Sequence, residues 1–370
     1  MPHTSPPRAW AEVDLGALKH NLNVIRRAAN GAQIMPVVKA SAYGHGLEPV
    51  ARFLDNEGIV FFGVANVGEA RRISQCGCRT TPYILGPAFP EEREEIVLNN
   101  WRCFMSTPEE GDHYNSLARL YNKTLPIHIS IDVGMGRGGV LQSQIPDLIN
   151  RIKSWDHLYI EGIGAHLPCA DENREVTLSN IQQFEQAVET ISAHVPLPWR
   201  HLCSSAGILD YTVPSANLVR PGIILYGYSP LANHPLGNEL KPALVLKSRL
   251  TVVRTLPPHH GVSYGQEFKT DTPMRVATVG IGYADGYMRL LHKKGVQVYY
   301  NGHFCPVLGR ITMDQIMIDV SQVPEAQPGD IVEIMGEHIT VPDLARMAET
   351  IPWEILTSIG PRIPRVYSAD

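Results

Sequence analysis

The sequence has no apolar run approaching the roughly 18 residues that a membrane-spanning helix needs. Its opening stretch, MPHTSPPRAW, lacks the apolar core of a secretory signal peptide. Charges of both signs are interspersed without long blocks, and the formal net charge is -5. Composition therefore gives no reason to expect nucleic acid or an anionic membrane as a partner. These absences predict a cytoplasmic protein that acts on a small molecule.

Metal and redox motifs are also missing. Six cysteines are spread through the chain, and the closest pair, Cys76 and Cys78, lacks the two-residue spacer of common metal-binding or redox motifs. Fifteen histidines are present, but there is no HExxH motif and no Cys/His ligand quartet. We therefore expect reduced thiols and no metal site.

No internal repeat, low-complexity tract or long charged linker divides the chain. At 370 residues, of which 44% are hydrophobic, it exceeds the size at which a single core normally stops growing. Near residues 229 to 240 the pattern of the sequence changes from alternating strand-like and helix-like segments to successive β-like runs. We therefore expect a first domain at residues 1–236 and a second at residues 237–370, joined by a short connection.

In the first domain, eight short apolar runs alternate with amphipathic helical patterns. This alternation predicts an α/β fold, a closed parallel (β/α)8 barrel of the TIM type rather than an open sheet. An additional strand at about residues 8–14 precedes them, followed by a helix capped by Asp14, and this strand is a candidate to pack with the C-terminal domain. The eight runs are PVVK, FFGVAN, TPYILG, RCFMS, IHISID, GIGAHL, RHLCSS and NLVRPG.

The second domain reads as mostly β. Successive β-like runs, including ALVLKSRLTVVRTL, MRVATVGIGYA, VQVYYNG, QIMIDVS and DIVEIMG, are separated by Gly, Pro and Asn. A late amphipathic stretch, VPDLARMAETI, is the only helix that the pattern predicts there.

Lys39 follows the first apolar run in VVKASAYGHG, at the carboxyl end of a barrel strand, where TIM barrels place their chemistry. Desolvation at such a site lowers a lysine's pKa and makes it a nucleophile towards carbonyls. For a lone lysine, the alternative is a stem that reaches solvent at the strand end. Four more polar residues follow other strands and converge on the same mouth: Arg137, His166, Ser205 and Arg220.

The eighth run supplies a candidate anion site in NLVRPGIILYG. Gly222 there lets a phosphate approach the backbone, although a Pro-Gly pair such as Pro221 and Gly222 on its own more commonly forms a simple turn. A lysine nucleophile together with a phosphate site favours a phosphorylated aldehyde cofactor.

Six motifs occur in order along nearly the whole chain: VVKASAYGHG, IDVGMGRGG, RPGIILYGY, VSYGQEF, GYADGYMR and GRITMDQ. In this order they resemble the motifs of alanine racemases. The resemblance implies a fold-type III pyridoxal 5'-phosphate enzyme, with a barrel and a β domain, acting as a head-to-tail homodimer. It also implies interconversion of L-alanine and D-alanine by a two-base mechanism, which supplies D-alanine for bacterial peptidoglycan synthesis.

The resemblance implies a role for each matching residue. Lys39 and Tyr264 are the two catalytic bases, and Tyr264 acts on the cofactor of the other subunit. Arg220 faces the pyridine nitrogen and leaves it unprotonated, because an arginine does not give up its proton. A tyrosine base needs nearby positive groups, and His166 and Arg289 are the candidates. The implied cofactor-binding residues are Lys39, Tyr43, His166, Ser205, Arg220, Gly222 and Ile223; the substrate-binding residues are Arg137 and Met313; the supporting or gate residues are Asp314, Tyr283 and Arg289.

Four positions depart from the family pattern: Ser41, Ser130, Ser204 and Pro361. Many relatives have at the position of Ser130 a lysine that is carboxylated and holds the neighbouring arginine, so Arg137 needs another anchor. These changes leave open a racemase for serine, lysine or several amino acids on the same scaffold. Two further alternatives are a non-catalytic pyridoxal phosphate carrier, which lacks the β domain, and an interaction protein derived from a racemase.

Overall fold

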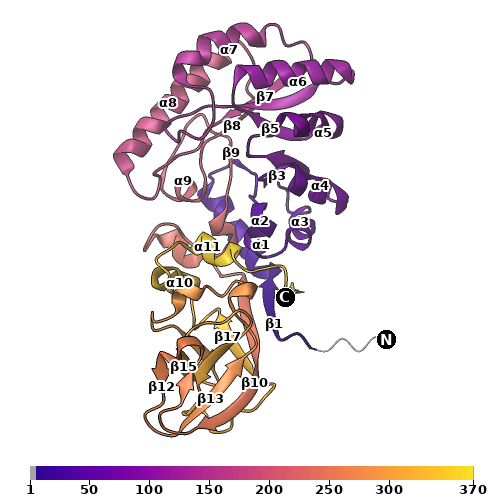
Figure 1. The fold of residues 1–370 in the computed structure, drawn as a ribbon. Helices are drawn as coiled ribbons and strands as arrows, with labels where there is room; N and C mark the ends of the chain where they lie inside the picture. The colour runs from indigo at the N-terminus through magenta and orange to yellow at the C-terminus, as the bar shows by residue number, and fades with distance from the viewer. Residues whose placement is uncertain (1–5, 370) are drawn as a thin grey trace. The chain divides into compact units, whose positions relative to one another are not determined.

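The computed structural model describes residues 6–369, which fall into two compact units. The barrel unit comprises Leu18–Ala42 and Leu47–Lys241. The β unit comprises the described residues up to Ala17, the short segment Tyr43–Gly46, and the chain from Pro242 onwards. In Figure 1, helices α3 to α8 surround the strands of the barrel unit, and the β unit contains the orange and yellow strands.

Eight parallel strands form the barrel, which confirms the predicted fold class. Six of them, β3 to β8, pair in sequence order, and β2 pairs with β9. The ring closes on both sides, because Arg220 N–H donates to Cys203 O beside β8 and Val37 bridges to Gly63 of β3. The strands are β2 (Gln33–Ile34), β3 (Phe61–Val64), β4 (Thr81–Ile84), β5 (Arg102–Met105), β6 (Leu125–Ser130), β7 (Leu158–Gly164), β8 (Trp199–His201) and β9 (Leu218–Val219).

The helices between the strands begin where the sequence provides caps. The side chains of Asn66, Thr107 and Asn173 each accept a hydrogen bond from a backbone N–H of the first turn that follows. Asp14 does the same for Ala17 at the start of α1, at 2.9 Å. The helices are α1 (Leu15–Ala28), α3 (Leu47–Leu54), α4 (Val67–Gln75), α5 (Arg93–Asn99), α6 (Pro108–Leu120), α7 (Ile145–Ile152), α8 (Arg174–Ser192) and α9 (Ser205–Asp210).

The first barrel strand differs from its expected position. Regular pairing ends at Ile34, and the PVVK run continues only through the isolated Val37–Gly63 bridge. The chain then turns into α2 (Lys39–Tyr43), where Ala40, Ser41 and Ala42 have φ of 52°, 55° and 53°. Such left-handed conformations cost about 1–2 kcal/mol per residue with a side chain. Strain of this kind is tolerated where the surroundings hold the segment in place.

The β unit is a sheet whose central strands close on themselves. The long strand β10 pairs with β17 on one side and with β13 on the other, so that β10, β13, β16, β15, β14 and β17 form a ring. Every pair in the ring is antiparallel. The strands are β10 (Leu244–Leu256), β13 (Met274–Val279), β14 (Gln297–Tyr300), β15 (His303–Leu308), β16 (Ile316–Asp319) and β17 (Ile331–Met335).

The first strand of the chain belongs to this unit. β1 (Ala9–Asp14) pairs antiparallel with β10 and parallel with β18 (Arg365–Ser368). Two helices also occur here, α10 (Val341–Met347) and α11 (Pro352–Thr357), so the prediction of a single helix was wrong. The pattern hid α11 because it has only 6 residues, fewer than two turns.

Within residues 6–369, none of the helices is long and apolar enough to cross a membrane. No group of three or more His, Cys, Asp or Glu side chains there could hold a metal ion.

Candidate active site

Lys39 lies at the start of the left-handed turn α2 in the barrel unit. Burial lowers the pKa of its ammonium group, and the positive charges of Arg137 and Arg220 lower it further against the opposing effect of Glu69. Glu69 also holds the turn, because its carboxylate accepts hydrogen bonds from the N–H groups of Ala40 at 2.7 Å and Ala65 at 2.8 Å. The lysine is therefore both presented on a fixed backbone and biased towards its neutral, nucleophilic form.

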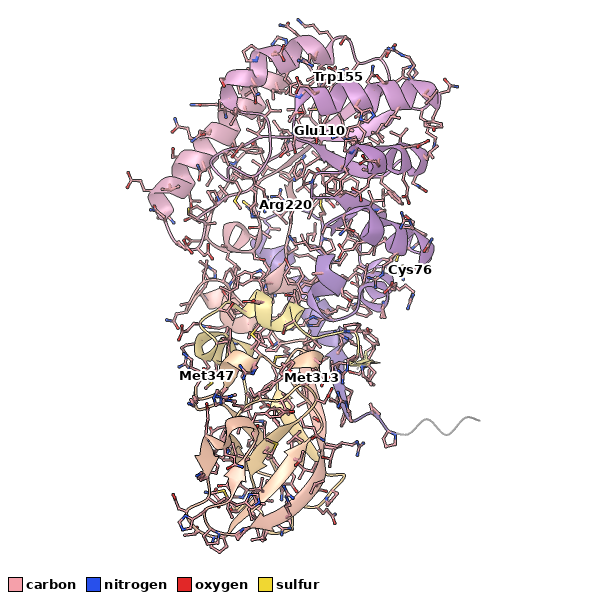
Figure 2. All side chains as sticks on the ribbon, in the orientation of Figure 1. Cys76, Glu110, Trp155, Arg220, Met313 and Met347 are labelled. Carbon is pink, nitrogen blue, oxygen red and sulfur yellow. The ribbon has the colours of Figure 1, made fainter. Side chains whose placement is uncertain are left out.

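Arg220, labelled in Figure 2, follows β9. The residue is only 4% exposed. Its guanidinium donates to the Nδ1 atom of His201 at 2.6 Å, and to backbone oxygens of Ala165, His201 and Leu202 at 2.6, 2.8 and 3.1 Å. Burial lowers its pKa to about 10. It therefore remains cationic at neutral pH, as expected from the sequence, although by a narrower margin than an exposed arginine.

A small polar cradle joins two short helices of the barrel unit. Ser205 begins α9, and its Oγ accepts a hydrogen bond from the N–H of Gly222 at 3.1 Å. The 3-10 helix η3 (Ile223–Tyr226) starts directly after Gly222, and the first N–H groups of a helix have no partner within it. These groups suit a phosphate. Tyr43 ends α2 with a buried side chain, and burial raises the pKa of its phenol.

His166 differs from expectation in its charge. It was expected to supply positive charge for a tyrosine base. Burial lowers the pKa of its imidazole to about 3, and Arg220, Arg137 and Lys39 add to the shift because each is a cation. The lowered pKa favours a neutral His166 at pH 7, which does not support the positive charge expected of it.

Arg137 lies in the exposed loop after β6. The loop is shaped by Asp132, whose carboxylate accepts hydrogen bonds from the N–H groups of Gly134 and Gly136 at 2.9 and 3.0 Å. Within residues 6–369 no ion pair involves Arg137. Ser130, at the end of β6, is a neutral residue and supplies no counter-charge.

Tyr264 stands in the β unit at the tip of a tight turn between β11 (Gly261–Val262) and β12 (Phe268–Lys269), and it is 70% exposed. The preceding residue, Ser263, has a φ of 64°, and its hydroxyl donates to Arg310 O at 2.5 Å. Gly265, which follows, has a φ of 76° and lies against the Arg310 guanidinium. The turn is thus fixed on both sides of the tyrosine.

Glu267 stabilises the turn that carries Tyr264, a role that the sequence did not suggest. Its carboxylate binds Arg310, His292 at 2.7 Å and Lys293 at 3.0 Å. The pKa of Glu267 is lowered to about 2. The hydrogen bond from Arg310 has the largest lowering effect, followed by those from Lys293 and His292. Arg289 is exposed in η7 (Arg289–Leu291), and within residues 6–369 no hydrogen bond or ion pair joins it to Tyr264.

Two adjacent segments of the β unit carry the remaining predicted residues. Tyr283 begins η6 (Tyr283–Asp285) and is 41% exposed, and its N–H donates to Thr312 O at 3.0 Å. The N–H of Ala284 donates to Met313 O at 3.0 Å. Within the described residues no hydrogen bond engages the N–H of Met313, because the turn is closed by Thr312 and Gln315 instead. This amide is therefore available to an acceptor.

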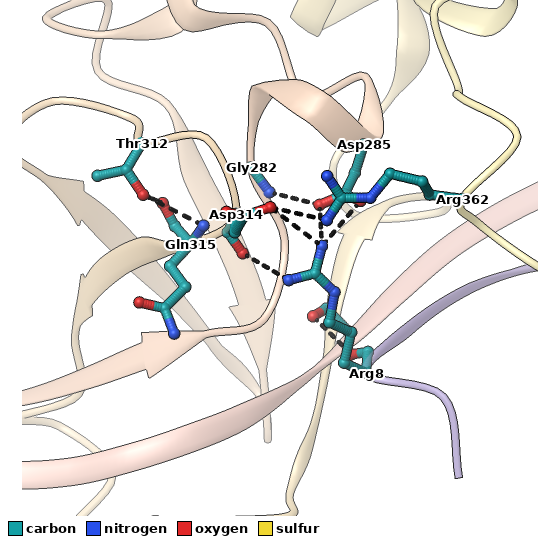
Figure 3. A network of polar contacts seen from close by, with 8 residues as sticks. Arg8, Gly282, Asp285, Thr312, Asp314, Gln315 and Arg362 are labelled. Carbon is teal, nitrogen blue, oxygen red and sulfur yellow. Dashed lines mark hydrogen bonds and ion pairs between the residues drawn. The ribbon is translucent and has the colours of Figure 1, made fainter. Parts of the chain in front are cut away.

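A buried carboxylate locks these segments together, as Figure 3 shows. Asp285 is 1% exposed and accepts hydrogen bonds from Arg8 Nη2 at 2.9 Å and from the N–H of Gly282 at 3.0 Å, and it forms an ion pair with Arg362 Nε at 3.2 Å. Asp314 accepts from Arg362 at 2.7 Å, and Arg362 lowers its pKa. Arg8 and Arg362 come from opposite ends of the sequence.

Replacing Asp285 by asparagine should destabilise the β unit. The change removes the negative charge of a buried carboxylate that two partly exposed arginines share, and a hydrogen bond to a charged group contributes about 1.5–3 kcal/mol. The free energy of unfolding from urea denaturation measures the loss. Glu349→Gln is the matched control, because the Glu349–Lys294 pair is exposed and such pairs contribute little. Equal losses in both variants would contradict a structural role for Asp285.

Comparison with known families matches both parts of the chain. The family "Alanine racemase, N-terminal domain" matches residues 13–230, and "Alanine racemase, C-terminal domain" matches residues 243–367. The chain is 36% identical over 365 residues to the alanine racemase of Halothermothrix orenii, covering 97% of this chain and 96% of that protein. It is 37% identical to alanine racemase 1 of Clostridium acetobutylicum, covering 97% of this chain and 95% of that protein.

Solved structures of alanine racemases are also similar to this chain. The alanine racemase of a D-cycloserine-producing Streptomyces lavendulae superimposes with a TM-score of 0.93 at 31% identity, covering 99% of this chain and 98% of that chain. The alanine racemase of Bartonella henselae, solved with covalently bound pyridoxal phosphate, has a TM-score of 0.87 at 31% identity, covering 98% of this chain and all of that chain. The chain described here belongs to the alanine racemase family.

Proposed function

We propose that this chain interconverts L-alanine and D-alanine with pyridoxal 5'-phosphate held covalently by Lys39. The observation that carries the proposal is the environment of Lys39, whose pKa is lowered by burial and by two neighbouring arginines. A lowered pKa favours the neutral amine, which attacks a carbonyl and also accepts and returns a proton.

Residues that follow the barrel strands along the chain fit this cofactor. Ser205, Gly222 and Ile223 form a neutral cradle of hydroxyl and N–H groups that suits its phosphate, and Tyr43 is the fourth residue of the proposed phosphate site. Arg220 would donate to the pyridine nitrogen. When bound, the cofactor draws electrons from the substrate's α carbon and so makes the proton there removable. An arginine partner keeps that withdrawal moderate, because it does not transfer its own proton.

Inverting the α carbon requires proton carriers on two faces. Lys39 would serve one face through its Nζ atom, and Tyr264 the other through its phenol oxygen. Tyr264 is largely exposed at the tip of its turn, which supports a role outside its own subunit. We therefore propose a homodimer in which Tyr264 of the partner subunit completes each site. The proposed domain division, with residues 1–236 for cofactor binding and residues 237–370 for the second base, follows from this arrangement.

A small anionic substrate fits the remaining groups. Arg137 and the available N–H of Met313 would bind the substrate carboxylate, with Asp314 beside the Met313 contact. Tyr283 would narrow the entrance, and Arg289 would support Tyr264. These assignments favour a substrate no larger than alanine.

The proposed cellular role is the supply of D-alanine for bacterial peptidoglycan, and the proposed location is the cytoplasm. All six cysteines are free, which suits a reducing compartment.

Deuterium incorporation tests the proposal. In heavy water, each alanine antipode should acquire deuterium at its α carbon while its rotation decays to zero, because every inversion exchanges that hydrogen with a protein group in contact with solvent. Mass spectrometry with chiral chromatography measures both. Parallel assays with serine and lysine as substrates show whether the substrate selectivity differs in this chain, which has Ser130 where many relatives have a lysine. L-alanine that keeps its rotation with cofactor supplied would contradict the proposal.

A further inference from the structure

A chain of polar side chains runs from the buried Arg220 to the partly exposed Arg102 in the barrel unit. Arg220 contacts His201 Nδ1 at 2.6 Å, and His201 Nε2 lies 2.9 Å from His128 Nδ1. His128 Nε2 lies 3.3 Å from Glu161 Oε2, and Arg102 holds both oxygens of Glu161 at 3.0 Å. Both histidines are 0% exposed. We call these five residues the imidazole relay.

The two ends of the imidazole relay determine the direction of every hydrogen bond in it. Arg220 has only donors, so His201 Nδ1 must be the unprotonated acceptor and Nε2 must carry the proton. His201 then donates to His128 Nδ1, which leaves the proton of His128 on Nε2. That proton points to the Glu161 carboxylate. The whole relay therefore requires the Nε2–H tautomer of both imidazoles.

Charges within the relay support the same assignment. Burial lowers the pKa of His128 and of His201, so both imidazoles are neutral. Hydrogen bonds from His128 and Arg102, which outweigh the cost of burial, lower the pKa of Glu161 to about 2 and keep it anionic. Within residues 6–369 no carboxylate forms an ion pair with Arg220. The relay is thus the polar connection between Arg220 and a negative charge.

The barrel wall is built to hold the two imidazoles. A Cβ atom on Gly162 would lie 2.7 Å from His128 Nδ1, and one on Gly164 would lie 2.5 Å from His201 Cε1, so both positions exclude a side chain. The ring of Tyr83 meets both imidazoles edge-on, with centroid distances of 4.8 and 5.5 Å. The imidazoles are therefore enclosed on several sides, and their tautomers depend on their hydrogen-bond partners.

We propose that Glu161 is a positioning residue for Arg220: it fixes the tautomers of His128 and His201 so that His201 presents a lone pair to the guanidinium. This inference rests on the proposed function only in that Arg220 is the partner of the cofactor's pyridine ring. If the tautomers inverted, an N–H of His201 would face the N–H of Arg220, and the guanidinium would lose its side-chain acceptor.

The test is ¹⁵N NMR of histidine-labelled full-length protein as purified, with His128 and His201 assigned by substitution. In the unaltered protein both residues should be protonated at Nε2 alone. Glu161→Leu removes the acceptor at one end and leaves only the Arg220 contact to oppose inversion, so a fraction protonated at Nδ1 should appear at both residues. Glu161→Gln keeps an acceptor oxygen and should restore the original pattern without the charge. Arg102→Leu is the matched control, because it breaks the same ion pair but leaves Glu161 bonded to His128, and the tautomers should stay.

Either of two results would overturn the proposal. One is an Nδ1 proton on His128 or His201 in the unaltered protein, which needs no variant to fold. The other is an Arg102→Leu variant that loses the Nε2–H pattern as completely as Glu161→Leu. Because the readout needs no substrate, it stands apart from the racemisation assay.

Discussion

Replacing Lys39 by alanine should abolish covalent attachment of pyridoxal phosphate and reduce racemisation by at least about 10³-fold. Lys39 has two proposed roles: it holds the cofactor, and it carries the proton on one face of the substrate. Alanine can perform neither role. Burial and two arginines lower the pKa of its amine and so favour the nucleophilic form, and no other lysine of the chain is expected to substitute for it. The loss should appear in kcat, because Arg137 and Met313 remain in place.

Borohydride reduction followed by peptide mapping measures the attachment directly. In the unaltered protein the label should lie on the peptide containing Lys39, and in Lys39→Ala it should be absent. Lys153→Ala is the control, because Lys153 is an exposed lysine at the end of α7. A variant without Lys39 that still retains a reducible, covalently bound cofactor would show that the lysine has been misassigned.

The strand pattern of the barrel was readable from the sequence because parallel strands are buried on both faces and form short apolar runs. All four residues of β3 are buried, for example. The left-handed turn after Lys39 was not readable, since Ala, Ser and Tyr have no preference for positive φ. That conformation is imposed by tertiary contacts such as those of Glu69, which lies 29 residues away from Ala40.

Long-range polar networks could not be predicted from the sequence for the same reason. His128 and His201 are 73 residues apart, and Arg8 and Asp285 are 277 apart, so only the closed fold brings each pair together. One local signal existed for the first pair. Gly162 and Gly164 alternate in the strand EGIG, and small residues at a two-residue spacing leave room on one face of a strand. The lowered pKa of His166 could not be predicted either, because it depends on burial and on cations from three other segments.

Replacing Tyr264 by phenylalanine should lower racemisation by about 10²–10⁴-fold while leaving the cofactor attached, since only a hydroxyl that moves a proton is removed. The ring stays, and the turn is held by Ser263, Arg310 and Glu267 rather than by the phenol. Stopped-flow racemisation and the absorbance of the bound cofactor measure the two quantities. Tyr159→Phe, which alters a tyrosine 45% exposed in the barrel unit, should leave both unchanged. An enzyme that keeps most of its activity with Phe at this position has another second base.

Mixing the two inactive variants tests where Tyr264 acts. If each site combines Lys39 of one subunit with Tyr264 of the other, a heterodimer of Lys39→Ala and Tyr264→Phe chains has one complete site and one site lacking both groups. Random exchange makes half of the dimers mixed, so activity should recover to about a quarter of the unaltered level. Differently tagged chains show whether exchange has occurred. Activity cannot recover if Tyr264 serves its own subunit, because every site then lacks one of its two proton carriers. A mixture that contains proven heterodimers but has no activity would therefore place both bases within one chain.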